Sequence, residues 1–450
     1  MHNEQPPNIA LVVLDTLRKD YFDQYFEWLP GLHFDSTYST SQWTIPAHAS
    51  LFTGRYPREV GVHSKHLQFD CPQPSLAEIL TDHGYTTQGF SANPNLSGHF
   101  GFDRGFDTFE SPLELMHLNS DQVVNWKSFI DESPYSGLPM YVHGALKCVL
   151  GNADTIKSLR SGFQQVLSDN TYTNPGGSEE GLNWVTRQTF EDPSFLFLNL
   201  MEAHEPYRAP EEYMTVEAPD LTHSIGDFVF EEDSKQIKTS SEQIRTAYEC
   251  CVRYLSDRYR DMFEKLSDRF DYIITIADHG ELLGEHEAWN HEHGVYPELT
   301  HIPLVVSGDG LSGKSKETIS IMDVYATILE LAGIDRDQEV RGRDLLNKDT
   351  NGSDILTEYT GLTPWSEERL RNNSDSNAIV QQYDKTLYGI AGSDGYAYQT
   401  ISGMNFYKGN LEDPENKIKK LLDTIPSRDV DPSDDLPDNV RQQLEDLGYA

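Results

Sequence analysis

The strongest constraint on the fold is a set of apolar, β-branched runs that each lead into a carboxylate or an imidazole. The first, residues 8–14 (NIALVVL), is typical of a strand buried on both faces of a parallel sheet. Similar runs occupy residues 194–201 and 272–277. Because open α/β sheets place ligands at the carboxyl ends of their strands, the side chains that follow these runs are candidate site residues. They are Asp15, His204, Asp278 and His279.

Helical patterns separate the strand-like runs. Residues 75–83 (SLAEILTDH) begin with a Ser N-cap, and Glu78 follows three residues later, which predicts a capping box. Apolar residues between 244 and 266 recur at steps of three and four, which indicates a long helix with one buried stripe. The other expected elements are strands at 85–92 and from Ile302, and a helix at Asp323–Leu331. This alternation predicts an α/β fold with a mainly parallel sheet.

The pattern of predicted strands and helices divides the chain into two parts. Residues 1–340 carry the alternating pattern, which a weakly patterned stretch at about 111–185 interrupts as an expected insertion. Residues 341–450 are expected to form a smaller β-rich subdomain with an acidic tail. Its strand-like segments are AIVQQY (378–383), YAYQTI (396–401) and MNFYKG (404–409).

The chain is strongly acidic, with 73 acidic against 35 basic residues and a formal net charge of −38. Because its apolar residues are patterned, we interpret this charge as the coat of a folded protein adapted to high salt. Such a surface repels nucleic acid and anionic membranes, so neither is an expected partner. No run approaches the roughly 20 apolar residues of a membrane span, and no signal peptide is evident, so a cytoplasmic location is expected. The oligomeric state is not predicted.

Carboxylate oxygens and an imidazole nitrogen at several strand ends form a ligand set for a divalent cation. The expected ligands are Asp15, Asp278 and His279, and Mn²⁺, Zn²⁺, Mg²⁺ or Ca²⁺ accepts such donors. One strand-end Asp alone is about as often a helix cap or a turn residue. The convergence of several strand ends favours a metal site, which would also attract a small anionic substrate to an acidic protein.

Several motifs in this chain resemble the sulfatase family of the alkaline-phosphatase superfamily. They are TIPAHASLFTG (44–54), HEPYRAP (204–210), ADHGELLGEH (277–286) and YPELTHIPLVV (296–306), with weaker echoes in VLDTLR (13–18) and GFDRGFDTFE (101–110). The resemblance covers most of the chain. It implies a mixed, mainly parallel sheet flanked by helices, a smaller C-terminal subdomain, and a metal-dependent hydrolase of sulfate or phosphate esters.

The chain departs from the family pattern at the nucleophile and around the metal. The family's Cys or Ser, which is oxidised to formylglycine, is replaced by Thr44, so an ordinary hydroxyl is the implied nucleophile and metal contact. The family's signature Arg falls on His48, and its Asp-Asp pair falls on Asp15 and Thr16. The family's Asn at the second metal motif is His279, and a nitrogen ligand favours Mn²⁺ or Zn²⁺ over Ca²⁺.

The resemblance also implies roles around the substrate. His204 is expected to protonate the leaving oxygen. The Lys and His of the family's Lys-Trp-His motif fall on Asn93 and Asn95, and its later catalytic Lys falls near His291 or His293. We expect these side chains, together with His48, to bind the non-bridging oxygens.

The sequence leaves the attacked atom and the reaction class open. Water can clear a phosphothreonine, whereas a sulfothreonine lacks the aldehyde hydrate that expels sulfate, so the chemistry at Thr44 favours phosphorus. A first alternative is transfer of a phosphoryl group to a sugar or lipid alcohol. A second is a non-catalytic binding protein that keeps the metal.

Overall fold

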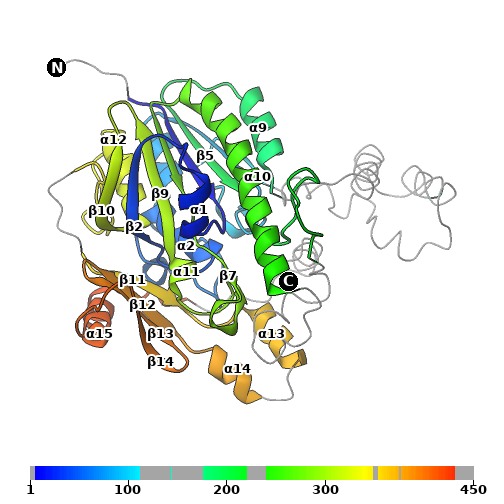
Figure 1. The fold of residues 1–450 in the computed structure, drawn as a ribbon. Coiled ribbons are helices and arrows are strands. Elements are labelled where there is room, and N and C mark those ends of the chain that lie inside the picture. Colours follow the sequence, from blue (N-terminus) through cyan, green and yellow to red (C-terminus); the bar gives the residue numbers. More distant parts are fainter. Residues whose placement is uncertain are drawn as a thin grey trace.

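The computed structural model describes residues 6–111, 143, 176–219, 240–347, 353–373 and 377–430. Within these ranges eight strands form one large sheet in the order β10-β2-β9-β6-β1-β5-β3-β4 (Figure 1). The strands are β1 (Ile9–Leu14), β2 (Leu32–Tyr38), β3 (Thr86–Ser91), β4 (Thr108–Glu110), β5 (Ser194–Leu200), β6 (Tyr272–Ile276), β9 (His301–Gly308) and β10 (Gly313–Ser320).

The centre of the sheet is parallel and fully buried. β1 pairs in parallel with β5 on one side and β6 on the other, and β5 pairs in parallel with β3. Every residue of β1 is buried, as the apolar run predicted. The carboxyl ends of these four strands therefore meet at one edge of the sheet. The predicted strand from Ile302 is β9, and it runs antiparallel to both β6 and β2, which makes the sheet mixed.

Helices cover the two faces of the large sheet. On one face α1 (Lys19–Tyr25) contacts α10 (Ser241–Ser267), which also contacts α9 (Ser178–Arg187) and β6. Another group joins α2 (Thr44–Thr53) to α4 (Leu76–Asp82) and α12 (Met322–Leu331). The short helices are α3 (Pro57–Val60), η1 (Gly98–Phe100), η5 (Glu285–Glu287) and α11 (Pro297–Thr300). The fold class expected from the sequence is confirmed.

The C-terminal part carries a second, antiparallel sheet, which lies below the large sheet in Figure 1. Its strands are β11 (Ile355–Tyr359), β12 (Leu387–Gly392), β13 (Gly395–Thr400) and β14 (Gly403–Tyr407). The helices of this part are α13 (Pro364–Asn373), α14 (Asn377–Tyr383) and α15 (Pro414–Thr424), and a small hairpin of the N-terminal part pairs β7 (Leu282–Leu283) with β8 (Trp289–Asn290).

One predicted strand is wrong. Residues 378–383 (AIVQQY) form helix α14, not a strand. Val380 is buried with Leu362 and Leu370 of the α13 region, and Ile379 and Tyr383 pack against the same cluster. The apolar residues thus follow the helical step of three and four. A run of only six residues is too short to distinguish this step from the pattern of a strand.

Two other sequence predictions lie mostly or wholly outside the described residues. The expected insertion at about 111–185 is described only at residue 111, at residue 143 and from residue 176. The acidic tail beyond residue 430 is also outside the described part. The boundary at residues 340 and 341 stays a prediction. None of the described helices is long and apolar enough to cross a membrane.

The capping box predicted at the start of α4 is present. Ser75 Oγ accepts a hydrogen bond from the backbone N–H of Glu78, and Glu78 Oε2 accepts one from the N–H of Ser75. We predict that Ser75→Ala lowers the free energy of unfolding by about 1 kcal/mol, because it leaves a helix N–H without its acceptor. Urea denaturation measures this loss. Ser75→Thr, which keeps the oxygen, should retain most of the stability, and an unchanged Ser75→Ala would contradict the capping role.

Candidate active site

Three ligand groups converge where the central strands end. Asp15 follows β1, and Asp278 and His279 follow β6. β1 and β6 pair with Val13 opposite Ile276, so the two aspartates, each two residues further on, leave the sheet side by side. All three side chains are fully buried, and their ligand atoms lie within 4.8 Å of one another. The geometry brings together the three residues predicted as metal ligands.

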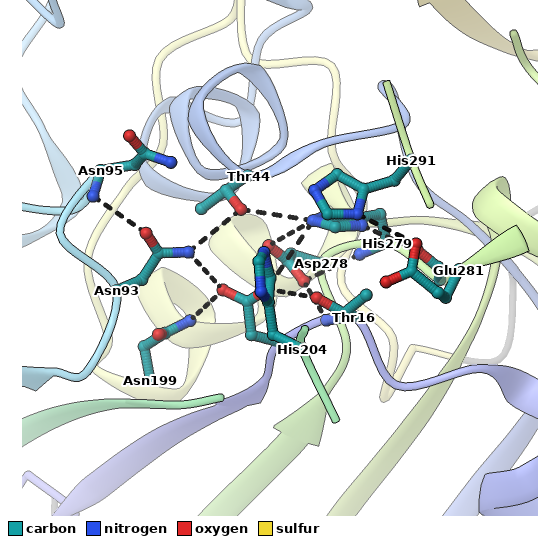
Figure 2. Close-up of polar contacts among 12 residues, drawn as sticks. Thr16, Thr44, Asn93, Asn95, Asn199, His204, Asp278, His279, Glu281 and His291 are labelled. Atoms are coloured by element: carbon teal, nitrogen blue, oxygen red, sulfur yellow. Dashed lines mark hydrogen bonds and ion pairs between the residues drawn. The ribbon is translucent and has the colours of Figure 1, made fainter. Parts of the chain in front are cut away.

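The carboxylate of Asp15 is surrounded by neutral donors. Thr16 Oγ1 donates to Oδ1 at 2.8 Å, and the amides of Asn93 and Asn199 donate to Oδ2 at 2.8 and 3.1 Å (Figure 2). Burial alone raises the pKa of Asp15, but the neighbouring histidines, His279 first, and the Asn93 bond outweigh it and lower the pKa to about 2. Asp15 is therefore held as an anion.

Only one of the two carboxylate oxygens of Asp278 accepts hydrogen bonds from the described residues. Its Oδ1 accepts hydrogen bonds from the backbone N–H groups of Thr16 and His279, at 3.3 and 2.9 Å. Its Oδ2 is buried and has no hydrogen-bond partner among the described residues, although His279 Nε2 and His48 Nδ1 lie 3.4 and 3.5 Å away. Burial, and then the nearby charge of Asp15, raise the pKa of Asp278 well above its usual value. The second carboxylate thus resists ionisation in this structure.

Thr44 stands at the edge of this cluster as the first residue of helix α2. Its hydroxyl lies 3.3 Å from His279 Nε2 and accepts a hydrogen bond from Asn93 Nδ2 at 3.2 Å. The free N–H groups of a helix N-terminus favour anions, so the start of α2 offers donors to an anionic group beside Thr44. Asn93 bonds to both Thr44 and Asp15 and so connects the predicted nucleophile to a predicted metal ligand.

Three histidine rings lie together beside the aspartates. The ring of His291 is 4.5 Å from that of His279 and 5.1 Å from that of His204. The Nδ1 atoms of His204 and His279 contact the carbonyl oxygens of Glu205 and Gly280, at 2.7 and 2.9 Å, so each Nδ1 carries the proton. In this tautomer Nε2 is the nitrogen without a proton, and such a nitrogen can accept a proton or bind a cation.

The carboxylate of Glu281 contacts the third histidine, His291. His291 Nδ1 lies 3.1 Å from Glu281 Oε1, and the carboxylate is fully buried. Burial raises the pKa of Glu281 to about 7, against the lowering effect of His204 and His279. Burial, and then the same two histidines, lower the pKa of His291 well below its usual value. Of the two histidines that the sequence left open, the structure brings His291 into the cluster.

The remaining predicted site residues are Asn95, His48 and His293, and they differ in how directly they contact the cluster. Asn95 donates its backbone N–H to Asn93 Oδ1 at 2.9 Å and so orients that amide. His48 lies one turn along α2, where its Nδ1 bonds the carbonyl oxygen of Thr44 at 3.0 Å. Burial lowers the pKa of His48 to about 4, so it is neutral at pH 7 and cannot neutralise substrate charge. His293 instead packs against the rings of Tyr359 and Tyr383.

Sequence reasoning missed two residues of this cluster. Asn199, which bonds Asp15, lies inside β5, where it is a single polar residue in an apolar run. Glu281 stood within the DHGE motif but was not assigned a role. A polar residue in a fully buried parallel strand was the available signal for Asn199, because such a side chain needs a buried partner.

The sulfatase family profile matches residues 7–334. This chain belongs to the sulfatase family. The resemblance of its motifs to that family is thereby confirmed.

Relatives of this sulfatase-family chain are distant but cover most of it. Arylsulfatase K of Xenopus laevis is 36% identical over 403 residues, covering 81% of this chain and 68% of that protein. The choline-sulfatase of Rhizobium meliloti (strain 1021) is 23% identical over 375 residues, covering 74% and 69%. The uncharacterized sulfatase YidJ of Escherichia coli (strain K12) is 22% identical over 338 residues, and the match spans 70% of this chain but only 63% of YidJ.

Solved structures share the fold. The phosphonate monoester hydrolase of Silicibacter pomeroyi superposes with a TM-score of 0.62 at 16% identity, covering 93% of this chain and 95% of that one. The 2-O glycosaminoglycan sulfatase BT1596 superposes with a TM-score of 0.60 at 14% identity, covering 94% and 92%. These likenesses establish the α/β architecture of the sulfatase family for this chain.

The buried residues fit a divalent cation. Two carboxylates and one imidazole share a dry cluster, and Asp278 Oδ2 lacks a hydrogen-bond partner there among the described residues. A cation would satisfy that oxygen and remove the repulsion that raises the pKa of Asp278.

We predict that saturating Mn²⁺ or Zn²⁺ raises the melting temperature and that a chelator reverses the rise. A ligand at about 100 times its Kd stabilises the native state by about 2.7 kcal/mol. In Asp278→Asn this metal-dependent rise should vanish, whereas the metal-free variant should be no less stable than the metal-free wild type, because a buried carboxyl is removed. Asp82→Asn, at an exposed position, is the control. Equal metal stabilisation of wild type and Asp278→Asn would exclude the site.

Proposed function

We propose that this sulfatase-family chain is a metal-dependent hydrolase of phosphate or sulfate esters, with Thr44 as its nucleophile. The observation that carries the proposal is the position of the Thr44 hydroxyl, 3.3 Å from His279 Nε2 at the edge of the Asp15, Asp278 and His279 cluster. A hydroxyl becomes a useful nucleophile when a cation or a base lowers its pKa. A helix N-terminus beside it also suits an anionic group.

Asp15, Asp278 and His279 would hold the cation, with Thr44 as a further ligand. When bound, the cation supplies Lewis acidity that favours the ionised Thr44 hydroxyl and counters charge on the ester. Mn²⁺ and Zn²⁺ are the proposed ions, and Ca²⁺ and Mg²⁺ are weaker candidates for a site with an imidazole ligand.

In the proposed reaction, residues of the chain orient the Thr44 hydroxyl and transfer the protons. Asn93 donates to Thr44 Oγ1 and fixes the side chain beside Asp15. His204, whose Nδ1 is tied to a backbone carbonyl, presents Nε2 as the atom that would protonate the leaving oxygen. His291 and Asn93 are the proposed contacts to the non-bridging oxygens, with Asn95 orienting Asn93. His48, as a neutral ring, bonds the carbonyl oxygen of Thr44 and so stabilises the first turn of α2.

The nucleophile favours phosphorus over sulfur as the attacked atom. A threonine ester of phosphate can be cleared by water that attacks phosphorus, whereas a threonine ester of sulfate lacks the neighbouring hydroxyl of an aldehyde hydrate that would expel it. Transfer to a sugar or lipid alcohol uses the same first step, so the acceptor decides between hydrolase and transferase. A non-catalytic metal protein would keep the cation and show no turnover.

We predict that Thr44→Ala lowers kcat on a phosphate ester by about 10³-fold or more, because the attacking oxygen is lost. Metal-induced stabilisation should survive, because Asp15, Asp278 and His279 remain. Thr44→Ser, which keeps a hydroxyl, should retain measurable turnover. The assay uses aryl phosphate, phosphodiester, phosphonate and sulfate esters with each cation at high salt.

Each arm of this assay excludes a stated alternative. Unchanged kcat in Thr44→Ala would eliminate the proposed nucleophile. Preferred turnover of the sulfate ester would overturn the preference for phosphorus. Product that appears only when a sugar or lipid alcohol is added would assign a transferase, and metal stabilisation without turnover of any ester would assign the binding protein.

We also propose that the acidic surface is an adaptation to high salt. The 73 acidic against 35 basic residues support it, and Asp261 and Glu264 are exposed carboxylates of α10. Like charges on a folded surface repel one another, and salt shortens the range of this repulsion.

The salt proposal predicts that the melting temperature rises as KCl increases from about 0.1 M to about 2 M, where the screening length falls below about 3 Å. Differential scanning calorimetry measures the rise. NaCl should act equally, because screening does not depend on the ion. A melting temperature that stays constant or falls would contradict the proposal.

A further inference from the structure

One residue beside the predicted metal ligands has a backbone conformation that its side chain disfavours. Thr16 follows Asp15, and its φ is 62°, in the left-handed region. Residues other than glycine seldom adopt this region, and for a β-branched residue such as threonine it is an outlier. Such a conformation persists only where surrounding contacts hold it, and it is most frequent at functional sites. Some group of the protein must therefore hold Thr16 in place.

Thr16 donates a hydrogen bond to each of the two buried carboxylates. Its hydroxyl donates to Asp15 Oδ1 at 2.8 Å, and its backbone N–H donates to Asp278 Oδ1 at 3.3 Å (Figure 2). Rotation about φ turns the side chain of a residue relative to its own N–H. A change of φ at Thr16 would therefore move one of the two donors away from its carboxylate.

The phenol of Tyr248 contacts the backbone on the other side of Thr16. Its hydroxyl donates to the carbonyl oxygen of Thr16 at 2.9 Å and accepts from the backbone N–H of Arg18 at 3.0 Å. Arg18 is the N-cap of α1, so one side chain of α10 holds both ends of the segment that leads from Thr16 into α1. Burial raises the pKa of Tyr248 well above its ordinary value, so the hydroxyl keeps the proton that it donates.

The ring of Tyr248 is closely packed. It is fully buried, and its centroid lies 4.9 Å from that of Tyr21 and 5.5 Å from that of Tyr207, both in edge-to-face contact. Tyr21 belongs to α1, and Tyr207 belongs to the HEPYRAP segment that also carries His204. Since a ring packed in this way keeps one position, its hydroxyl can hold the backbone of Thr16 at one point.

A role in packing alone explains less of this arrangement. Tyr248 belongs to the buried stripe of α10, and a buried tyrosine hydroxyl usually finds a hydrogen-bond partner. Tyr259 of the same stripe is the ordinary case, because its hydroxyl bonds the side chain of Thr275 in β6. The partners of Tyr248 are instead backbone groups close to Asp15, and one of them belongs to the residue with the disfavoured conformation.

We propose that Tyr248 is a positioning residue for the metal site. It holds Thr16 in the left-handed conformation, and Thr16 in turn orients the carboxylates of Asp15 and Asp278 for a divalent cation. Groups that orient metal ligands contribute to affinity although they never touch the ion. The inference rests on the proposed metal site, but it does not depend on the proposed ester hydrolysis.

The test compares two buried tyrosines of α10 that each lose only a hydroxyl. We predict that Tyr248→Phe raises the Kd for Mn²⁺ by about tenfold, the lower end of the effect of removing a group that orients metal ligands. Tyr259→Phe, the matched control, loses one buried hydroxyl bond as well and should keep the Kd of the wild type. Isothermal titration calorimetry of the whole chain at high salt measures the Kd values. A thermal melt of each metal-free variant verifies that it is folded.

A second substitution tests whether Tyr248 acts through Thr16. Glycine adopts the left-handed region without a steric penalty, so a Thr16→Gly protein does not need the phenol to hold that conformation. Thr16→Gly alone should weaken Mn²⁺ binding, because the hydroxyl that donates to Asp15 is lost. Adding Tyr248→Phe to Thr16→Gly should then leave the Kd unchanged.

Each comparison has a result that would overturn the inference. An unchanged Kd in a folded Tyr248→Phe protein would do so, and so would an equal loss of affinity in Tyr259→Phe. A further tenfold loss when Tyr248→Phe is added to Thr16→Gly would show that the tyrosine acts by another route. A wild type that binds no Mn²⁺ would remove the metal site and this inference with it, whereas Mn²⁺ binding without ester turnover would contradict only the proposed hydrolysis.

Discussion

The repulsion between Asp15 and Asp278 is the constraint on which the rest of the site depends. Parallel pairing of β1 with β6 in register leaves the two carboxylates side by side, because neighbouring strands lie about 4.8 Å apart. The neighbouring histidines, His279 first, and neutral donors such as Asn93 stabilise Asp15 as an anion. Asp278 keeps one oxygen without a hydrogen bond. The fold therefore concentrates negative charge in a dry place, and a divalent cation is the simplest group that balances it.

On the proposed function, a bound cation would serve substrate binding as well as chemistry. The protein is acidic overall, and an anionic ester approaching Thr44 also meets Asp15 and Asp278. The hydrogen-bond and ion-pair partners of Asp15 and Thr44 among the described residues include no lysine or arginine. Arg18, although buried and close in sequence, bonds Asp20 and Glu285 instead. On the proposed function, local positive potential would then come from a bound cation and the N-terminus of α2.

The sequence predicted the parts of this site that depend on strand ends, because a buried parallel strand can be recognised from a short apolar run. Asp15, Asp278 and His279 come together as expected, and Thr44, which the family resemblance implied, lies beside them at the start of α2. Side chains whose role depends on the neighbouring strand could not be found in this way. Asn199 contacts Asp15 only because β5 pairs with β1, and Glu281 contacts His291 only because the β7–β8 hairpin folds back. The error at AIVQQY has the same origin, since its helix depends on packing against α13.

The substitutions relative to the family pattern are consistent with one another. A threonine in place of the formylglycine precursor requires activation by a neighbouring group, and His279 Nε2 lies 3.3 Å from that hydroxyl. In the proposed site the same imidazole would favour Mn²⁺ or Zn²⁺ over calcium. Replacing the signature arginine by His48, which burial keeps neutral, avoids placing a second cation next to the first. The proposed nucleophile, metal ligands and supporting residues thus favour the same chemistry.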